Sequence, residues 1–256
     1  MHFKSHANIP VFVPHMGCPH LCVFCDQKSI SGEKDELTPE KAQNQIEEAL
    51  STLQGRRAEI AFFGGSFTAI EREKMIAFLA LASSYLKSGR VSGIRLSTRP
   101  DCVDEEILDI LSFYGVSAVE LGVQSLDEEV LKASGRRHSV KDTADACARI
   151  KQRGCFLLGC QMMLGLPAST REKELLTARE ICRMGADCTR IYPTVVLKDT
   201  PLEALWKKGL YRPLSLEEGV LRGADCFEIF ENAGVKVLRM GLCAEESCRE
   251  QAVAGC

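Results

Sequence analysis

The sequence predicts an α/β fold, an open and partial (βα)6 barrel, and three observations support this prediction. Short apolar segments alternate with helical stretches along the chain, a pattern typical of a parallel sheet with right-handed crossovers. Six polar or glycine-rich motifs each follow the carboxyl end of one such segment, and ligands bind at that edge of parallel sheets. Six βα units fall short of the eight that close a regular barrel, so we expect an open side slot that admits a bulky substrate.

The expected strands are short runs rich in apolar residues. They cover Ile9–Val13, Glu59–Phe63, Gly93–Ser97, Val116–Leu121, Cys155–Gln161 and Asp187–Tyr192, with a further strand at Val235–Met240. The motifs after the first six strands are, in order, the cysteine run at 18–25, GGSF at 64–67, STRPD at 97–101, GVQS at 122–125, QMMLGLP at 161–167 and YPT at 192–194. We therefore expect these motifs to meet at one edge of the sheet.

The expected helices are marked by capping residues and by apolar periodicity. They cover residues 38 to about 53, 71–86, 105–113, 128–133, 140–153, 169–184 and 215–232. Four of them begin at a capping pattern: Thr38 before Pro39, Ser139 with Asp142, Ser169 with Glu172, and Ser215 with Glu218.

Composition and charge indicate a soluble globular chain. The 256 residues are 45% hydrophobic and 26% charged, which suits a single α/β domain. A formal net charge of -3 gives no bulk basicity, so a nucleic-acid partner would have to be held by a local patch. Neither a secretion signal nor a membrane span is visible, and thirteen cysteines without a signal imply a reducing compartment. We expect a cytoplasmic protein that does not contact a membrane.

Three cysteines crowd one loop near the start of the chain. Cys18, Cys22 and Cys25 follow the pattern C-x3-C-x2-C. Zinc sites and ferredoxin clusters usually use four protein ligands, so three thiolates indicate a cubane iron-sulfur cluster with one iron left open. Three alternatives are a zinc-dependent nucleic-acid module, an iron-sulfur electron carrier with a further cysteine ligand, and ordinary buried thiols.

At these cysteines the sequence resembles the radical SAM superfamily, whose hallmark is this spacing with an aromatic residue, here Phe24, before the last cysteine. The resemblance implies that Cys18, Cys22 and Cys25 bind a 4Fe-4S cluster. It also implies that the open iron is chelated by the amino and carboxylate groups of S-adenosylmethionine. A one-electron donor such as flavodoxin or ferredoxin is then an expected partner.

The resemblance extends to the residues expected to bind S-adenosylmethionine. GGSF matches the glycine motif that binds the methionine amino group, with Ser66 where many members have Glu. Gln124 and Arg136 are twelve residues apart, the spacing found in members similar to the oxygen-independent coproporphyrinogen oxidase. The full set expected to contact the cofactor is Phe24, Gly64, Gly65, Ser66, Ser97, Gln124, Arg136 and Gln161.

Within the superfamily the chain resembles the radical SAM domain of the catalytic subunit of Elongator and its bacterial homologues. FFGGSFT, STRPD, GVQSLDEEVLKASGRRHSV and LGCQMMLGLP occur in that order. The resemblance covers roughly residues 8 to 240, and the chain has no room for the acetyltransferase domain of the Elongator subunit. It implies reductive cleavage of S-adenosylmethionine to a 5′-deoxyadenosyl radical, with tRNA or another RNA as substrate. The alternative is a small-molecule substrate in the manner of coproporphyrinogen oxidase.

Some residues near the expected site have less specific assignments. Phe62, Leu121 and Met162 are expected to line a dry cavity or to be plain core, and Tyr192 is a candidate substrate contact. No catalytic role is assigned to His15 or His20, and no group that finishes the substrate reaction is identified.

We expect residues 1–240 to form the radical SAM core domain and residues 241–256 an incomplete or disordered tail. Cys243, Cys248 and Cys256 in this tail are candidates for a second cluster or for free thiols.

Overall fold

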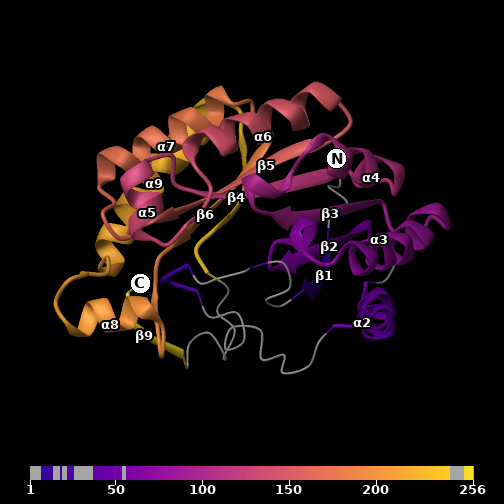
Figure 1. Ribbon diagram of the computed structural model, residues 1–256, viewed down its shortest axis with the longest axis horizontal. Helices are drawn as coiled ribbons and strands as arrows, with labels where there is room; N and C mark the ends of the chain where they lie inside the picture. Colours follow the sequence, from indigo (N-terminus) through magenta and orange to yellow (C-terminus); the bar gives the residue numbers. More distant parts are fainter. Residues whose placement is uncertain are drawn as a thin grey trace.

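The computed structural model describes residues 7–13, 18, 22–25, 37–53, 56–242 and 251–255. Within these residues, seven parallel strands form one sheet in the order β1-β2-β3-β4-β5-β6-β8, curled into an open half-barrel (Figure 1). The predicted fold class is confirmed, and the additional strand expected at 235–240 is β8. His15, His20, Cys243, Cys248 and Cys256 lie outside the described residues.

The strands of the half-barrel are β1 (Ala7–Val13), β2 (Ala58–Gly64), β3 (Gly93–Thr98), β4 (Ala118–Gln124), β5 (Leu157–Leu164), β6 (Cys188–Pro193) and β8 (Lys236–Met240). A separate antiparallel pair joins β7 (Val196–Leu197) to β9 (Ala252–Ala254), so residues at the far end of the chain pack beside the segment that follows β6.

The helices are α2 (Pro39–Thr52), α3 (Arg72–Lys87), α4 (Glu105–Phe113), α5 (Glu128–Ala133), α6 (Val140–Arg153), α7 (Arg171–Arg183), α8 (Pro201–Lys207) and α9 (Leu216–Asn232). Short 3-10 turns lie at Phe67–Ala69 and Pro100–Cys102. No sequence pattern predicted α8, β7 or β9.

Helix starts follow the capping predictions with one exception. Thr38 caps α2, and full capping boxes form at Ser139 with Asp142 and at Ser215 with Glu218. The Ser169–Glu172 prediction is wrong by one residue, because Thr170 caps α7. Ser169 instead donates its hydroxyl to the buried carboxylate of Glu174, 3.0 Å away.

One face of the sheet is apolar and packs against the helices. Phe62 on β2 stacks on Phe67 at 4.5 Å between ring centroids and lies 6.2 Å from Phe78 of α3. Leu121 and Met162 are likewise fully buried in this core. The expectation that these three residues line a cavity is therefore wrong. Side chains alternate along a strand, and theirs point outward to the helix layer.

The opposite, inner face carries charged and polar side chains at the middle of successive strands. Glu120 of β4 accepts hydrogen bonds from Arg95 of β3 at 2.8 Å and from Arg190 of β6 at 2.6 Å. Arg95 also donates to Glu59 of β2 at 2.6 Å, and Gln161 of β5 donates to Glu120 at 3.0 Å. We call these five residues the inner ion network. It ties five neighbouring strands together across the concave face.

The network is buried, so each of its charges depends on the others. Glu120 is only 1% exposed. Burial alone would raise the pKa of its carboxyl, but the hydrogen bonds from Arg190 and Gln161 and the charge of Arg95 hold the pKa below its usual value. Gly159 makes room for this carboxylate, since an added Cβ there would come within 2.7 Å of the Glu120 side chain.

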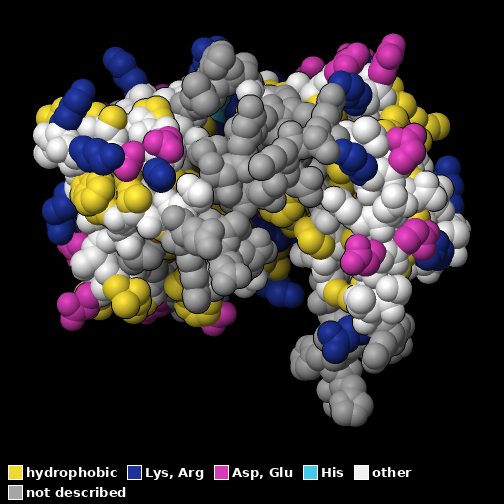
Figure 2. Space-filling model, turned by 90° about the horizontal axis from the view of Figure 1, so that it is seen from below, with side chains coloured by type: hydrophobic (Ala, Val, Ile, Leu, Met, Phe, Trp, Pro, Cys, Tyr) yellow, Lys and Arg dark blue, Asp and Glu magenta, His cyan; other side chains and the backbone are white. Residues whose placement is uncertain are grey.

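The face on which α2 and α8 lie carries mixed charges. Figure 2 shows the described Lys and Arg side chains there interspersed with Asp, Glu and apolar groups. This agrees with the nearly balanced formal charge of -3. None of the helices in the described residues combines the length and the apolar character needed to cross a bilayer.

The inner ion network yields a stability prediction. Replacing Glu120 by Ala leaves the buried guanidinium of Arg190 without its carboxylate, and removing one partner of a buried pair costs about 3–5 kcal/mol. We expect a loss of that size in the free energy of unfolding, measured with urea at pH 7. The matched control is Asp145→Ala, which breaks the exposed Lys141–Asp145 pair and should cost less than about 1 kcal/mol. If Glu120→Ala lowers the free energy of unfolding no more than Asp145→Ala does, the inner ion network does not stabilise the fold as described.

Candidate functional site

The three cysteines of the loop lie at the carboxyl edge of the half-barrel, and each is half-buried. The Cys25 N–H donates to the Cys22 carbonyl at 3.0 Å, which closes a tight turn. Cys18 Sγ lies 3.6 Å from Ser66 Oγ, so the motif after β2 meets the cysteine loop. Among the described residues, no three His, Cys, Asp or Glu side chains are grouped as a metal site.

The glycines after β2 permit close backbone approach. Gly64 has φ +107°, a conformation that favours glycine, and an added Cβ would lie 3.2 Å from the Val13 carbonyl oxygen of β1. The Gly65 N–H donates to the same carbonyl at 3.0 Å. The motif thus joins β1 to β2 directly before the cysteine loop, and Ser66 is buried beneath that loop.

The GVQS motif forms a bulge at the end of β4. The pairing with β5 shifts register between Gly122 and Gln124, and Gln124 adopts the left-handed region at φ 66°. Arg136 donates from Nη2 to the Gly122 carbonyl at 2.6 Å and from Nη1 to Cys22 Sγ at 3.3 Å. The predicted pair, Gln124 and Arg136, is therefore brought together beside one of the cysteines.

Two polar atoms of this pair are buried without a partner in the described part of the chain. Gln124 Oε1 and Arg136 Nε are both buried and have no hydrogen-bond partner within the described residues. Buried polar groups without partners are rare in folded proteins because each costs about 1–3 kcal/mol. An unpartnered acceptor on Gln124 and an unpartnered donor on Arg136 suit a ligand that carries both an ammonium and a carboxylate group.

Ser97 and Gln161 also meet, and both belong to the concave face. Gln161 Nε2 donates to Ser97 Oγ at 3.0 Å as well as to Glu120 at 3.0 Å. Tyr192, the candidate substrate contact, is half-buried on the same face, and burial raises the pKa of its hydroxyl against the opposing charge of Arg190. The inner ion network thus lies directly below the predicted site.

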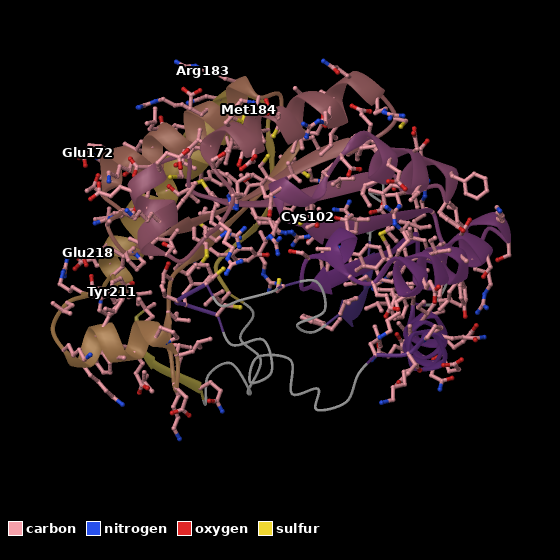
Figure 3. All side chains as sticks on the ribbon, viewed as in Figure 1. Cys102, Glu172, Arg183, Met184, Tyr211 and Glu218 are labelled. Atoms are coloured by element: carbon pink, nitrogen blue, oxygen red, sulfur yellow. The ribbon has the colours of Figure 1, made fainter. Side chains whose placement is uncertain are left out.

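The STRPD motif after β3 positions a further thiol. Arg99 pairs with Asp101 through two bonds of 2.9 Å and also donates to Cys102 Sγ at 3.1 Å. Burial raises the pKa of the Cys102 thiol to about 11, so it stays protonated at neutral pH. Figure 3 shows Cys102 near the middle of the view.

His138 is a site residue that sequence reasoning missed. It is 2% exposed, and its Nε2 lies 3.1 Å from the Val123 carbonyl within the GVQS bulge. Because a carbonyl only accepts, Nε2 carries the proton and Nδ1 is left without a partner. Burial, followed by the charge of Arg136, lowers the pKa of His138 to about 4. The neutral imidazole therefore holds the bulge that presents Gln124. Its only sequence signal was its position two residues after Arg136.

The fold and these contacts define an α/β half-barrel with a thiol-rich polar site at its carboxyl edge. A comparison with protein families matches residues 12–181 to the radical SAM superfamily and residues 186–256 to the Radical_SAM C-terminal domain. The chain belongs to the radical SAM superfamily.

Individual relatives are similar over much of the chain. An uncharacterized protein of Methanocaldococcus jannaschii is 30% identical, with 86% of this chain and 71% of that protein covered. A tRNA uridine(34) acetyltransferase of Dehalococcoides mccartyi is 28% identical, with 80% of this chain and 52% of that enzyme covered. The chain thus spans about half the length of that acetyltransferase.

Among solved structures, an archaeal Elp3 from Methanocaldococcus infernus with an N-terminal deletion has the same fold. It superimposes with a TM-score of 0.71 at 23% identity, covering 98% of this chain and 59% of the other. The predicted superfamily and its relation to the radical SAM region of the Elongator subunit are confirmed.

The buried His138 predicts a pH dependence of stability. The unfolded chain binds a proton near pH 6.5, whereas the folded chain does so only near pH 4. Stability should therefore fall as the pH drops through this window, by up to about 3 kcal/mol. His138→Gln keeps an N–H donor for Val123 but does not titrate, so the difference in unfolding free energy between parent and variant should change across the window.

The control for this measurement is His138→Leu, which removes the donor. We expect it to cost about 1–3 kcal/mol at pH 7, where His138→Gln costs less. If the unfolding free energies of the parent and His138→Gln change in parallel with pH, the lowered pKa of His138 is ruled out.

Proposed function

We propose that this chain is a radical SAM enzyme that holds a 4Fe-4S cluster through Cys18, Cys22 and Cys25 and binds S-adenosylmethionine beside it. Three thiolates are a donor set suited to an iron-sulfur cluster with one open iron. The family to which the chain belongs supplies the cofactors by implication. When bound, this pair of cofactors supplies a 5′-deoxyadenosyl radical by one-electron cleavage of a carbon–sulfur bond.

The observation that carries the proposal is the open pair Gln124 Oε1 and Arg136 Nε, buried next to Cys22. The methionine end of S-adenosylmethionine offers an ammonium donor and a carboxylate acceptor, which complement these two atoms. Arg136 already contacts both Cys22 and the Gly122 carbonyl, so its guanidinium links the cysteine loop to the predicted ligand pocket. These contacts support a pocket for the ammonium and carboxylate groups of S-adenosylmethionine beside Cys22.

The remaining predicted contacts have distinct roles in this proposal. Gly64 and Gly65 let the backbone approach the amino group, and Ser66 packs beneath Cys18. Ser97 and Gln161 are fixed to each other and offer polar groups to the sugar and methionine. Phe24 is held in an apolar cluster and shields the cysteine loop from water. The inner ion network keeps the floor of the site rigid.

We propose tRNA as the substrate. This rests on the similarity to relatives named tRNA uridine(34) acetyltransferase, which the chain matches over part of their length. With a formal net charge of -3, the chain would hold RNA through local groups at the mouth of the half-barrel. A flavodoxin or ferredoxin is the expected electron donor, and a reducing cytoplasm is the expected location because thirteen thiols persist there.

The chemistry is tested by anaerobic reconstitution with iron and sulfide, followed by dithionite and S-adenosylmethionine and an assay for 5′-deoxyadenosine. We expect a brown protein that forms this product, and complete loss in Cys22→Ala. Cys155→Ala removes an exposed thiol and should behave as the parent. Product formation by Cys22→Ala at the parental rate would refute the cluster assignment.

The substrate is tested by adding total tRNA, which should stimulate cleavage of S-adenosylmethionine. If the enzyme cleaves S-adenosylmethionine but tRNA does not stimulate it, only the substrate proposal is overturned.

Arg136 and its neighbour Arg137 allow a matched test of the pocket. Arg137 is exposed, whereas Arg136 faces Cys22 and Gly122. Arg136→Ala should weaken S-adenosylmethionine binding about 10- to 100-fold, since a charge-assisted hydrogen bond contributes about 1.5–3 kcal/mol. Arg137→Ala should leave the dissociation constant within about twofold. Equilibrium dialysis with the reconstituted protein measures both, and equal effects would show that Arg136 is not a ligand contact.

A further inference from the structure

The backbone of the cysteine loop is held from two directions at Val23. Its N–H donates to the Ser134 carbonyl at the end of α5, 3.1 Å away. Its carbonyl accepts from the Leu202 N–H in the first turn of α8, 2.9 Å away. Val23 lies directly between Cys22 and Cys25, so a segment about 180 residues later in the chain is bonded to the metal-binding loop.

An apolar cluster surrounds this contact. Val196, Leu202 and Tyr211 are buried together, and the side chains packed against them are Val23, Phe24, Leu205, Trp206 and Ala254. This cluster is separate from the main core between sheet and helices. It contains side chains from β7, from α8 and its C-terminal extension to Tyr211, and from β9.

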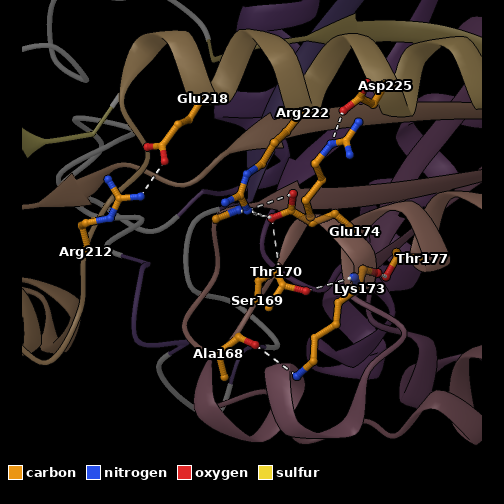
Figure 4. A network of polar contacts seen from close by, with 12 residues as sticks. Ala168, Ser169, Thr170, Lys173, Glu174, Thr177, Arg212, Glu218, Arg222 and Asp225 are labelled. Atoms are coloured by element: carbon orange, nitrogen blue, oxygen red, sulfur yellow. Dashed lines mark hydrogen bonds and ion pairs between the residues drawn. The ribbon is translucent and has the colours of Figure 1, made fainter.

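Tyr211 connects the cluster to the half-barrel. Its hydroxyl donates to the Gly165 carbonyl at 2.7 Å, in the turn that follows β5. The Gly165 N–H in turn donates to Glu174 at 2.7 Å, and Arg222 of α9 donates to the same carboxylate at 3.2 Å (Figure 4). The turn after β5 is therefore fixed on both sides, and the segment carrying Tyr211 is anchored to a rigid part of the fold.

The described residues 22–25 of the cysteine loop form a tight turn. Ordering such a turn costs conformational entropy that contacts with other segments must offset. Three thiols can hold a cluster only if the loop keeps them in place. Leu202 and Tyr211 belong to the buried cluster against which Phe24 packs, so they support the loop without contributing a ligand.

We propose that residues 196–211 form a clamp that orders the cysteine loop, with Leu202 and the Tyr211 ring as its positioning residues. This assigns a task to the region that matches the Radical_SAM C-terminal domain: it completes the cluster-binding site from outside the cysteine motif. The role of the clamp in cluster binding rests on the proposed iron-sulfur function. Its effect on the order of the thiols is independent of that function.

The test measures thiol exposure in the full-length, metal-free chain. Anaerobic alkylation with iodoacetamide, followed by peptide mass spectrometry, gives a rate for each cysteine. We expect Leu202→Ala to raise the rates of Cys22 and Cys25 about tenfold or more, because the truncation leaves a cavity beneath Phe24 and frees the loop. The exposed Cys155 is a control for the reactivity of the reagent, and the buried Cys160 is a control for global unfolding. The alkylation rates of both should be the same in the variant as in the parent.

Two further variants separate the clamp from general destabilisation. Leu108→Ala truncates a fully buried leucine in α4, on the opposite side of the molecule from α8 (Figure 1), and should not expose Cys22 or Cys25. Tyr211→Phe keeps the ring and should keep the rates within about twofold of the parent, whereas Tyr211→Ala should raise them. After reconstitution, Leu202→Ala should release iron to a chelator about tenfold faster than Leu108→Ala.

Unchanged Cys22 and Cys25 rates in Leu202→Ala, or equal increases in Leu108→Ala, would overturn the clamp. A chain that shows the expected thiol rates but binds no iron would instead retain the clamp and refute the proposed cofactor. The two failures are therefore distinguishable.

Discussion

The structure depends on a carboxylate buried in the middle of a curled parallel sheet. Glu120 is surrounded by Arg95, Arg190 and Gln161, each from a different strand. Because a buried charge without partners is strongly unfavourable, the relative positions of these strands are fixed by the need to satisfy it. A half-barrel lacks the closing strands that hold a complete barrel in shape, and here hydrogen bonds across the concave face provide that constraint. The residues proposed to bind the ligand lie next to this face.

The sequence predicted the fold because two simple periodicities were clear. Apolar runs alternated with capped helices, and the polar motifs fell at the carboxyl ends of the strands. In the structure GVQS and QMMLGLP begin within β4 and β5, because these strands extend about three residues beyond their predicted ends. The direction of individual side chains was harder to predict. Phe62 and Met162 were candidates for the cavity wall, although strand alternation assigns them to the helix-facing side. The charged residues within apolar strands, such as Arg95 in GIRLST and Glu120 in AVELGVQ, were the available signal for the polar face.

The structure brings together some of the residues predicted for the site. Ser97 contacts Gln161 and Ser66 contacts Cys18, while Gln124 and Arg136 both lie beside Gly122. His138 could not be predicted from its residue type, because buried histidines also occur as ordinary core residues. Its role depends on a bulge in β4, and bulges leave no reliable trace in sequence. The contacts of α8 with the cysteine loop depend on the path of the whole chain, which local patterns do not encode.

The left-handed backbone of Gln124 has a consequence for how this protein balances folding against recognition. A glycine would adopt φ 66° without penalty, and the side chain present there accepts about 1 kcal/mol or more of strain. Its amide also ends in a buried oxygen that the described part of the protein leaves unsatisfied. Both features raise the cost of glutamine at this position in the folded chain. Backbone strain of this kind gathers at functional sites, which supports the proposed contact between Gln124 and S-adenosylmethionine.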